Sequence, residues 1–82
     1  MGEMFSDWLS SQMDRVGIRS GRRLALESGL DEELILDWAI GRRVPPPNEV
    51  ERLARFFGVP SGDAQTLRAQ TEQILALSRP RR

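Results

Sequence analysis

The sequence contains no cysteine and no histidine. The chain therefore has no thiol nucleophile, no imidazole to act as an acid or base near neutral pH, and none of the usual ligands of zinc. Disulfide bonds are excluded too, so helix packing must stabilise the fold, as in proteins of a reducing cytoplasm. Because 82 residues are also few to enclose a substrate, we predict a protein that is not an enzyme and that binds no cofactor or metal.

Long apolar runs are missing as well. No segment approaches the roughly 20 apolar residues that cross a bilayer. The first residues, MGEMFSDWLSSQ, lack the charged and apolar regions of a signal peptide. We therefore expect a cytoplasmic protein with no membrane partner.

The net charge is zero, and no lysine is present: twelve arginines balance twelve acidic residues. The charges are unevenly placed, because residues 1–41 hold mostly acids and residues 42–82 mostly arginines. Arginine is the better ligand for phosphate, although a GC-rich genome would favour it equally. A strongly basic chain would indicate nucleic acid directly, and this chain is not strongly basic.

Apolar spacing and capping residues predict five helices and no strand. Gly17, Gly29 and Gly58 are expected to end three of them, while Ser20 and Asp31 can cap the starts of two. The expected helices span residues 5–16, 21–28, 32–39, 47–57 and 61–78. The inward residues of the first helix are expected to be Phe5, Trp8, Leu9, Met13 and Val16.

The predicted second and third helices carry a spacing of their own. Small Ala25 permits a close approach, and Leu30, Ile35 and Trp38 would lock the third helix across a turn at Gly29. Together with the following GRRVPPPNEVERLARFFGVP, this order resembles the phage-repressor helix-turn-helix family of Cro- and XRE-type proteins.

The resemblance covers about residues 5–60 and implies an all-α fold, a compact five-helix lambda-repressor-like bundle. Its helix-turn-helix would consist of the second and third helices. Residues 1–60 would form the helix-turn-helix domain, and residues 61–82 the C-terminal helix and basic tail of the same domain. One departure is Gly21, which stands where the family often has a phosphate-contacting glutamine.

The resemblance also implies that the third helix enters the major groove of DNA. The base-facing residues would then be Glu32, Glu33 and Asp37, since a carboxylate can accept a hydrogen bond from cytosine N4. The candidates for phosphate contacts share a position beside this helix: they are Arg22, Arg23, Arg42 and Arg43. Three further arginines could form a flexible arm: Arg79, Arg81 and Arg82. Each arginine could equally be a solvated surface charge or pair with a nearby acid.

Two functions follow from these residues. The first is a sequence-specific DNA-binding transcriptional regulator that binds double-stranded DNA as a homodimer. The second is a protein-interaction module on the same fold, because the stretch DEELILD holds four carboxylates and no arginine. In that case Leu36 and Ile40 would contact the protein partner from an apolar surface rimmed by acids. The last helix is expected either to pack on the first or to pair with a second copy of itself.

Overall fold

The computed structural model describes residues 4–78, and all regular secondary structure in that range is helical. The helices are α1 (Phe5–Val16), α2 (Gly21–Ser28), α3 (Glu32–Ala39), α4 (Pro47–Phe57) and α5 (Gly62–Ser78). The predicted all-α fold of five helices is therefore confirmed. No helix of the described range is long and apolar enough to cross a membrane.

The helices begin and end where the sequence predicts, because local capping determines their bounds. The Ser20 hydroxyl accepts from the Arg23 N–H at 3.1 Å, and the Asp31 carboxylate accepts from the Leu34 N–H at 3.2 Å. Both contacts satisfy an amide that the first turn of a helix leaves without a partner. Pro47 is the first residue of α4, where its missing N–H costs nothing.

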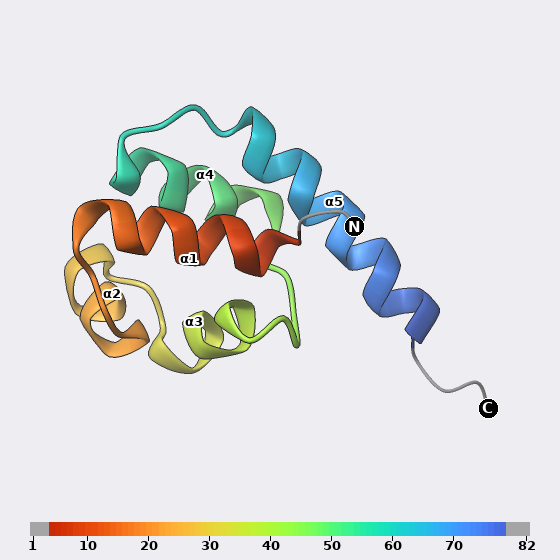
Figure 1. The fold of residues 1–82 in the computed structure, drawn as a ribbon, viewed down its shortest axis with the longest axis horizontal. Coiled ribbons are helices and arrows are strands. Elements are labelled where there is room, and N and C mark those ends of the chain that lie inside the picture. Colours follow the sequence, from red (N-terminus) through yellow and green to blue (C-terminus); the bar gives the residue numbers. More distant parts are fainter. Residues whose placement is uncertain (1–3, 79–82) are drawn as a thin grey trace.

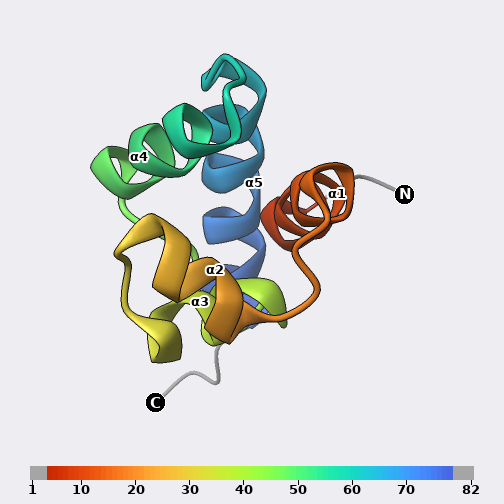
Figure 2. The same ribbon diagram turned by 90° about the vertical axis from the view of Figure 1, so that its left-hand side faces the viewer.

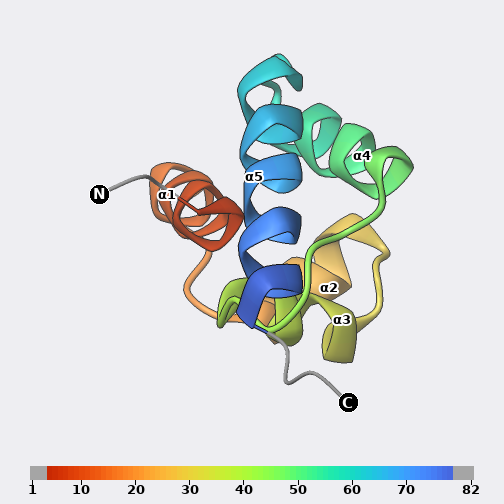
Figure 3. The same cartoon turned by 90° about the vertical axis from the view of Figure 1, so that its right-hand side faces the viewer.

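In the packing, α5 lies between α1 and α4. α5 lies against α1 and α4, and α3 lies against α1 and α2. Figure 1 shows the last turns of α5 extending past the other helices, and Figure 3 shows α5 between α1 and α4. Figure 2 shows α2 and α3 lying together beside α4. One apolar core joins all five helices: Phe5, Trp8, Leu9, Met13, Ile18, Leu24, Leu30, Ile35, Trp38, Val50, Leu53, Phe57 and Ala64.

One predicted core residue of α1 is wrong. Val16 is 42% exposed, whereas Ile18, beyond the end of the helix, is buried. The chain reverses at Gly17, and the Ile18 N–H binds the Met13 carbonyl at 2.8 Å. This reversal returns the Ile18 side chain to the end of α1, so it takes the buried place that helical periodicity assigned to Val16.

A buried hydrogen bond joins the first helix to the last. The backbone N–H of Phe5 donates to the hydroxyl of Thr71 at 2.7 Å, and both residues are almost completely buried. Met4, which precedes α1, gives the helix no side-chain cap. Thr71 in α5 therefore supplies the acceptor that the N-terminus of α1 needs. Of the two arrangements expected for the last helix, its packing on the first is present.

Polar side chains of α5 also hold α4 and the loop before it. Arg68 donates to the Pro45 carbonyl at 2.7 Å, and Gln65 donates to the Pro47 carbonyl at 2.9 Å. Ser61 and Gln65 both donate to the carboxylate of Glu51, and these hydrogen bonds, with a smaller contribution from the charge of Arg55, lower the pKa of Glu51. The segment between α3 and α4 is therefore positioned from α5.

We expect Thr71→Val to destabilise the protein by about 1–3 kcal/mol, because it keeps the side-chain shape and leaves the buried Phe5 N–H without an acceptor. Urea unfolding of the two proteins measures the difference. Thr66→Val is the matched control, since Thr66 lies exposed on the same helix and its hydroxyl, among residues 4–78, binds only the Gly62 carbonyl of that helix. Equal free energies of unfolding for wild type and Thr71→Val would contradict the role assigned to Thr71.

Candidate nucleic-acid interface

The outer face of α3 carries acids at its start and apolar residues at its end. Glu32 and Glu33 are exposed in the first turn, where carboxylates stabilise the helix dipole. Leu36 is 45% exposed and Ile40 is 67% exposed, while Ile35 and Trp38 on the opposite face lie in the core. The face is therefore accessible to a partner at both ends of the helix and partly at Leu36.

The start of α2 lies against the middle of this face. A Cβ atom built on Gly21 would come within 2.9 Å of a methyl group of Leu36 and within 3.3 Å of Ile35. A larger residue at position 21, such as glutamine, would require the Leu36 side chain to move. The absence of a side chain at Gly21 thus lets the N-terminus of α2 and the exposed Arg22 lie close to α3.

The end of α3 is a sharp backbone reversal at Gly41. Gly41 has a φ of 83°, a left-handed conformation that glycine adopts without a steric penalty. The Gly41 N–H donates to the Trp38 carbonyl at 3.3 Å, and the Arg42 N–H donates to the Asp37 carbonyl at 2.9 Å. This pair of bonds defines the Schellman motif, in which the residue after the glycine returns to a residue five positions earlier. Here those two residues are Arg42 and Asp37.

The side chains at this reversal form a charge cluster. The carboxylate of Asp37 lies 3.8 Å from Nη1 of Arg42 and 3.4 Å from Nε of Arg43. The Asp37 side chain is 23% exposed, against 71% for Arg42 and 63% for Arg43. Asp37, which was predicted to face a base, is therefore paired with Arg42 and Arg43, which were predicted to contact phosphates.

Two other helix ends in this chain use the same motif with apolar residues. At Gly17 the returning pair is Ile18 and Met13, and at Gly58 it is Val59, whose N–H binds the Ala54 carbonyl at 3.0 Å. An apolar contact is the usual companion of this motif. The reversal after α3 is different, since it brings an acid and a base together on the surface. The sequence signal for that pair is an aspartate four residues before a glycine, with an arginine directly after the glycine.

The remaining predicted phosphate ligands stand apart from this cluster. Arg23 forms an ion pair with Glu27, one turn further along α2. Arg22 is exposed and forms no ion pair within residues 4–78. The predicted flexible arm of Arg79, Arg81 and Arg82 lies outside the described residues.

A hollow beside the charge cluster lies between the α3–α4 loop and α5. It has a volume of about 390 Å³ and is lined by Arg42, Arg43, Val44, Glu72 and Leu75. Glu72 is itself paired with Arg68 at 3.2 Å. This hollow leaves space for an anion next to the two arginines.

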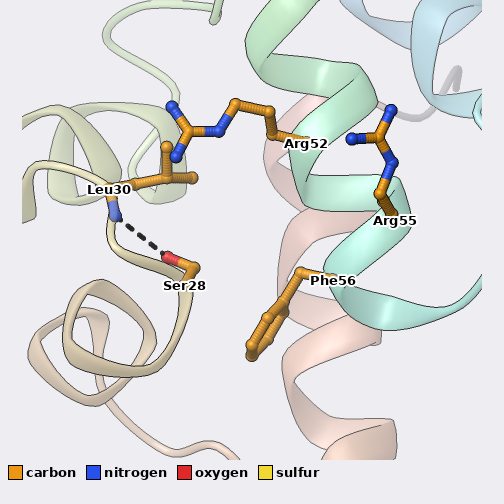
Figure 4. Close-up of a pocket in the computed structure, with 5 residues that line it drawn as sticks. All are labelled: Ser28, Leu30, Arg52, Arg55 and Phe56. Atoms are coloured by element: carbon orange, nitrogen blue, oxygen red, sulfur yellow. Dashed lines mark hydrogen bonds between the residues drawn. The ribbon is translucent and has the colours of Figure 1, made fainter.

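A second hollow lies between α4 and the turn after α2. It measures about 230 Å³ and is lined by Ser28, Leu30, Arg52, Arg55 and Phe56 (Figure 4). Figure 4 shows the guanidinium of Arg52 next to Leu30 and that of Arg55 directed elsewhere. Ligand sites usually measure roughly 300–1,000 Å³, so this hollow is too small and its arginines too divergent to form one.

No family model, curated protein or solved structure matches this chain. Within residues 4–78 no group of acidic side chains is arranged to hold a metal ion. The candidate interface thus consists of three parts that lie close together along the chain or in space: the exposed face of α3, the start of α2, and Arg42 and Arg43 after α3.

We expect Gly41→Ala to destabilise the protein by about 1–2 kcal/mol, because the new side chain meets only ordinary contacts but a left-handed backbone is strained for alanine. The control is Gly62→Ala at the start of α5, where the added methyl group meets no atom within 4 Å and the backbone is helical. Thermal unfolding should show the control to be neutral or slightly stabilised. If both variants unfold like wild type, the reversal at Gly41 does not require glycine.

Proposed function

We propose that this protein is a sequence-specific DNA-binding transcriptional regulator that places α3 in the major groove. The observation that carries the proposal is the placement of arginines around one exposed helix face. Arg22 lies where α2 approaches the middle of α3, and Arg42 and Arg43 follow its C-terminal end. A duplex lying along α3 would present phosphates of its two strands to these two positions.

The parts of the interface would have different roles. The N-terminus of α2 offers backbone N–H groups and the exposed charge of Arg22 to one phosphate. Glu32 and Glu33 would face the base edges, where a carboxylate accepts from cytosine N4. Arginine contacts to phosphate would position the helix and supply attraction that the acidic face lacks.

Pairing of two copies is part of this proposal, since a single unit offers little surface for tight and specific binding. The described end of α5 carries the highly exposed Leu77. That end extends past the other helices (Figure 1), which would make it accessible to a second copy.

A protein-interaction module is the second candidate function. It is favoured by the exposure of Leu36 and Ile40 beside two acidic residues that no described arginine neutralises. Ile40 distinguishes the two functions better than Leu36, because Leu36 also contacts the start of α2. Binding of a basic amphipathic peptide that is lost in Ile40→Ser, without a change in duplex binding, would favour this second function.

The DNA proposal is tested by the salt dependence of binding to random duplex DNA. Affinity should fall steeply with salt, because neutralised phosphates release counterions. Arg42→Ala and Arg43→Ala should each weaken binding to every sequence about equally and reduce the salt slope by about 1. Fluorescence anisotropy with a labelled duplex measures both effects.

Arg55→Ala is the control for this experiment, since it removes one exposed charge near the end of α4 and leaves in place every arginine that the proposal uses. It should leave the salt slope unchanged. The proposal fails if wild type shows no binding at low salt, or if Arg55→Ala matches the two loop variants.

A further inference from the structure

The carboxylate of Asp37 occupies the place that a phosphate would take between two arginines. It lies within 4 Å of Arg42 and Arg43 at once, at 3.8 Å and 3.4 Å. A phosphate oxygen and a carboxylate oxygen are interchangeable ligands for a guanidinium. Asp37 therefore satisfies these side chains from within the chain.

The backbone keeps the three residues together whatever their side chains do. The carbonyl of Asp37 accepts from the N–H of Arg42 at 2.9 Å and of Arg43 at 3.4 Å. The reversal at Gly41 holds the same geometry through the Trp38 carbonyl. An exchange of the carboxylate for another anion thus requires only side-chain rotation, with no change in the helix end.

The two ion pairs are loose enough to exchange. Neither has the short, aligned geometry of a hydrogen bond, and both arginine side chains are mostly exposed. Exposed pairs of this kind contribute little net free energy, because water and salt screen them. The hollow beside the arginines, which Glu72 also lines, leaves room for the incoming anion.

We propose that Asp37 is a positioning residue for Arg42 and Arg43 and does not read a base: it holds both guanidinium groups in the free protein and yields them to DNA phosphates on binding. This inference rests on the proposed DNA-binding function. Each loop contact to phosphate then replaces an internal ion pair. The exchange lowers affinity for all duplexes alike, because phosphates carry no sequence information.

A double-mutant cycle in duplex affinity tests this role. Asp37→Asn keeps the backbone and the side-chain shape and removes the carboxylate charge. It should raise affinity for random duplex by roughly two- to tenfold, the range that two exposed ion pairs allow. The control is Asp63→Asn, which removes one exposed acidic charge in the first turn of α5, outside the proposed interface. Its effect should be smaller than that of Asp37→Asn.

The cycle is closed in the Arg42→Ala, Arg43→Ala background. There the effect of Asp37→Asn should fall clearly below its effect in wild type, because no guanidinium remains to be released. Equal effects of Asp37→Asn in both backgrounds would overturn the role of Asp37, while duplex binding by wild type would leave the proposed function intact. Binding by Asp37→Asn with none by wild type would overturn the exchange, because the carboxylate would then keep the arginines from the phosphates instead of yielding them.

A measurement without DNA separates the role of Asp37 further from the proposed DNA-binding function. The Nε–H signal of Arg43 in NMR spectra reports on the ion pair, since this nitrogen faces Asp37. Titration with inorganic pyrophosphate should shift that signal at a lower concentration in Asp37→Asn than in wild type. Equal titration curves would overturn the exchange. A clear difference between the two titration curves would support the exchange of the carboxylate for phosphate. If no variant then bound duplex DNA, that failure would count against the proposed function alone.

Discussion

The hydrogen bond between the Phe5 N–H and the Thr71 hydroxyl is the constraint from which the arrangement of this small protein follows. It joins residues 66 positions apart and fixes α5 along the start of α1. With α5 in that place, Arg68 reaches the Pro45 carbonyl in the loop before α4, and Gln65 reaches the carbonyl of Pro47 at the start of α4. The loop that begins with Arg42 and Arg43 is thus held from the far end of the chain, and the candidate interface depends on a contact remote from it.

The positions of the helices could be predicted because local chemistry determines them. Ser20 and Asp31 cap helix starts by contacts within three residues, and Gly58 ends α4 in the same local way. The errors arise where tertiary contacts decide burial. Val16 fits the periodicity of α1 but lies in the last turn before the reversal at Gly17, where it is largely exposed. Thr71 has the polarity of a surface residue and is buried because another helix needs its hydroxyl.

In the candidate site, too, some features could be predicted from the sequence and others depend on how the chain folds. The family resemblance assigned Glu32, Glu33 and Asp37 to one face of α3, and in the structure Glu32 and Glu33 are exposed while Asp37 is partly buried. The pairing of Asp37 with Arg42 follows instead from the backbone reversal, which brings together residues five apart. At Gly17 the same reversal brings Met13 and Ile18 together in the core. The Schellman motif favours an apolar contact between these two positions. Opposite charges at both positions of a sequence are therefore informative, because they indicate an ion pair there instead.

The acidic α3 face need not conflict with DNA binding if its charges are considered one by one. Glu32 and Glu33 lie in the first turn, where the helix dipole stabilises a carboxylate without any partner. Asp37 lies too far along the helix for that stabilisation and is compensated by the two arginines after it. On the proposed function, the first pair contributes base contacts and the third acid controls how readily the arginines are released. Affinity would then be set at the end of α3 and sequence preference at its start, so substitutions at the two ends should change different properties of binding.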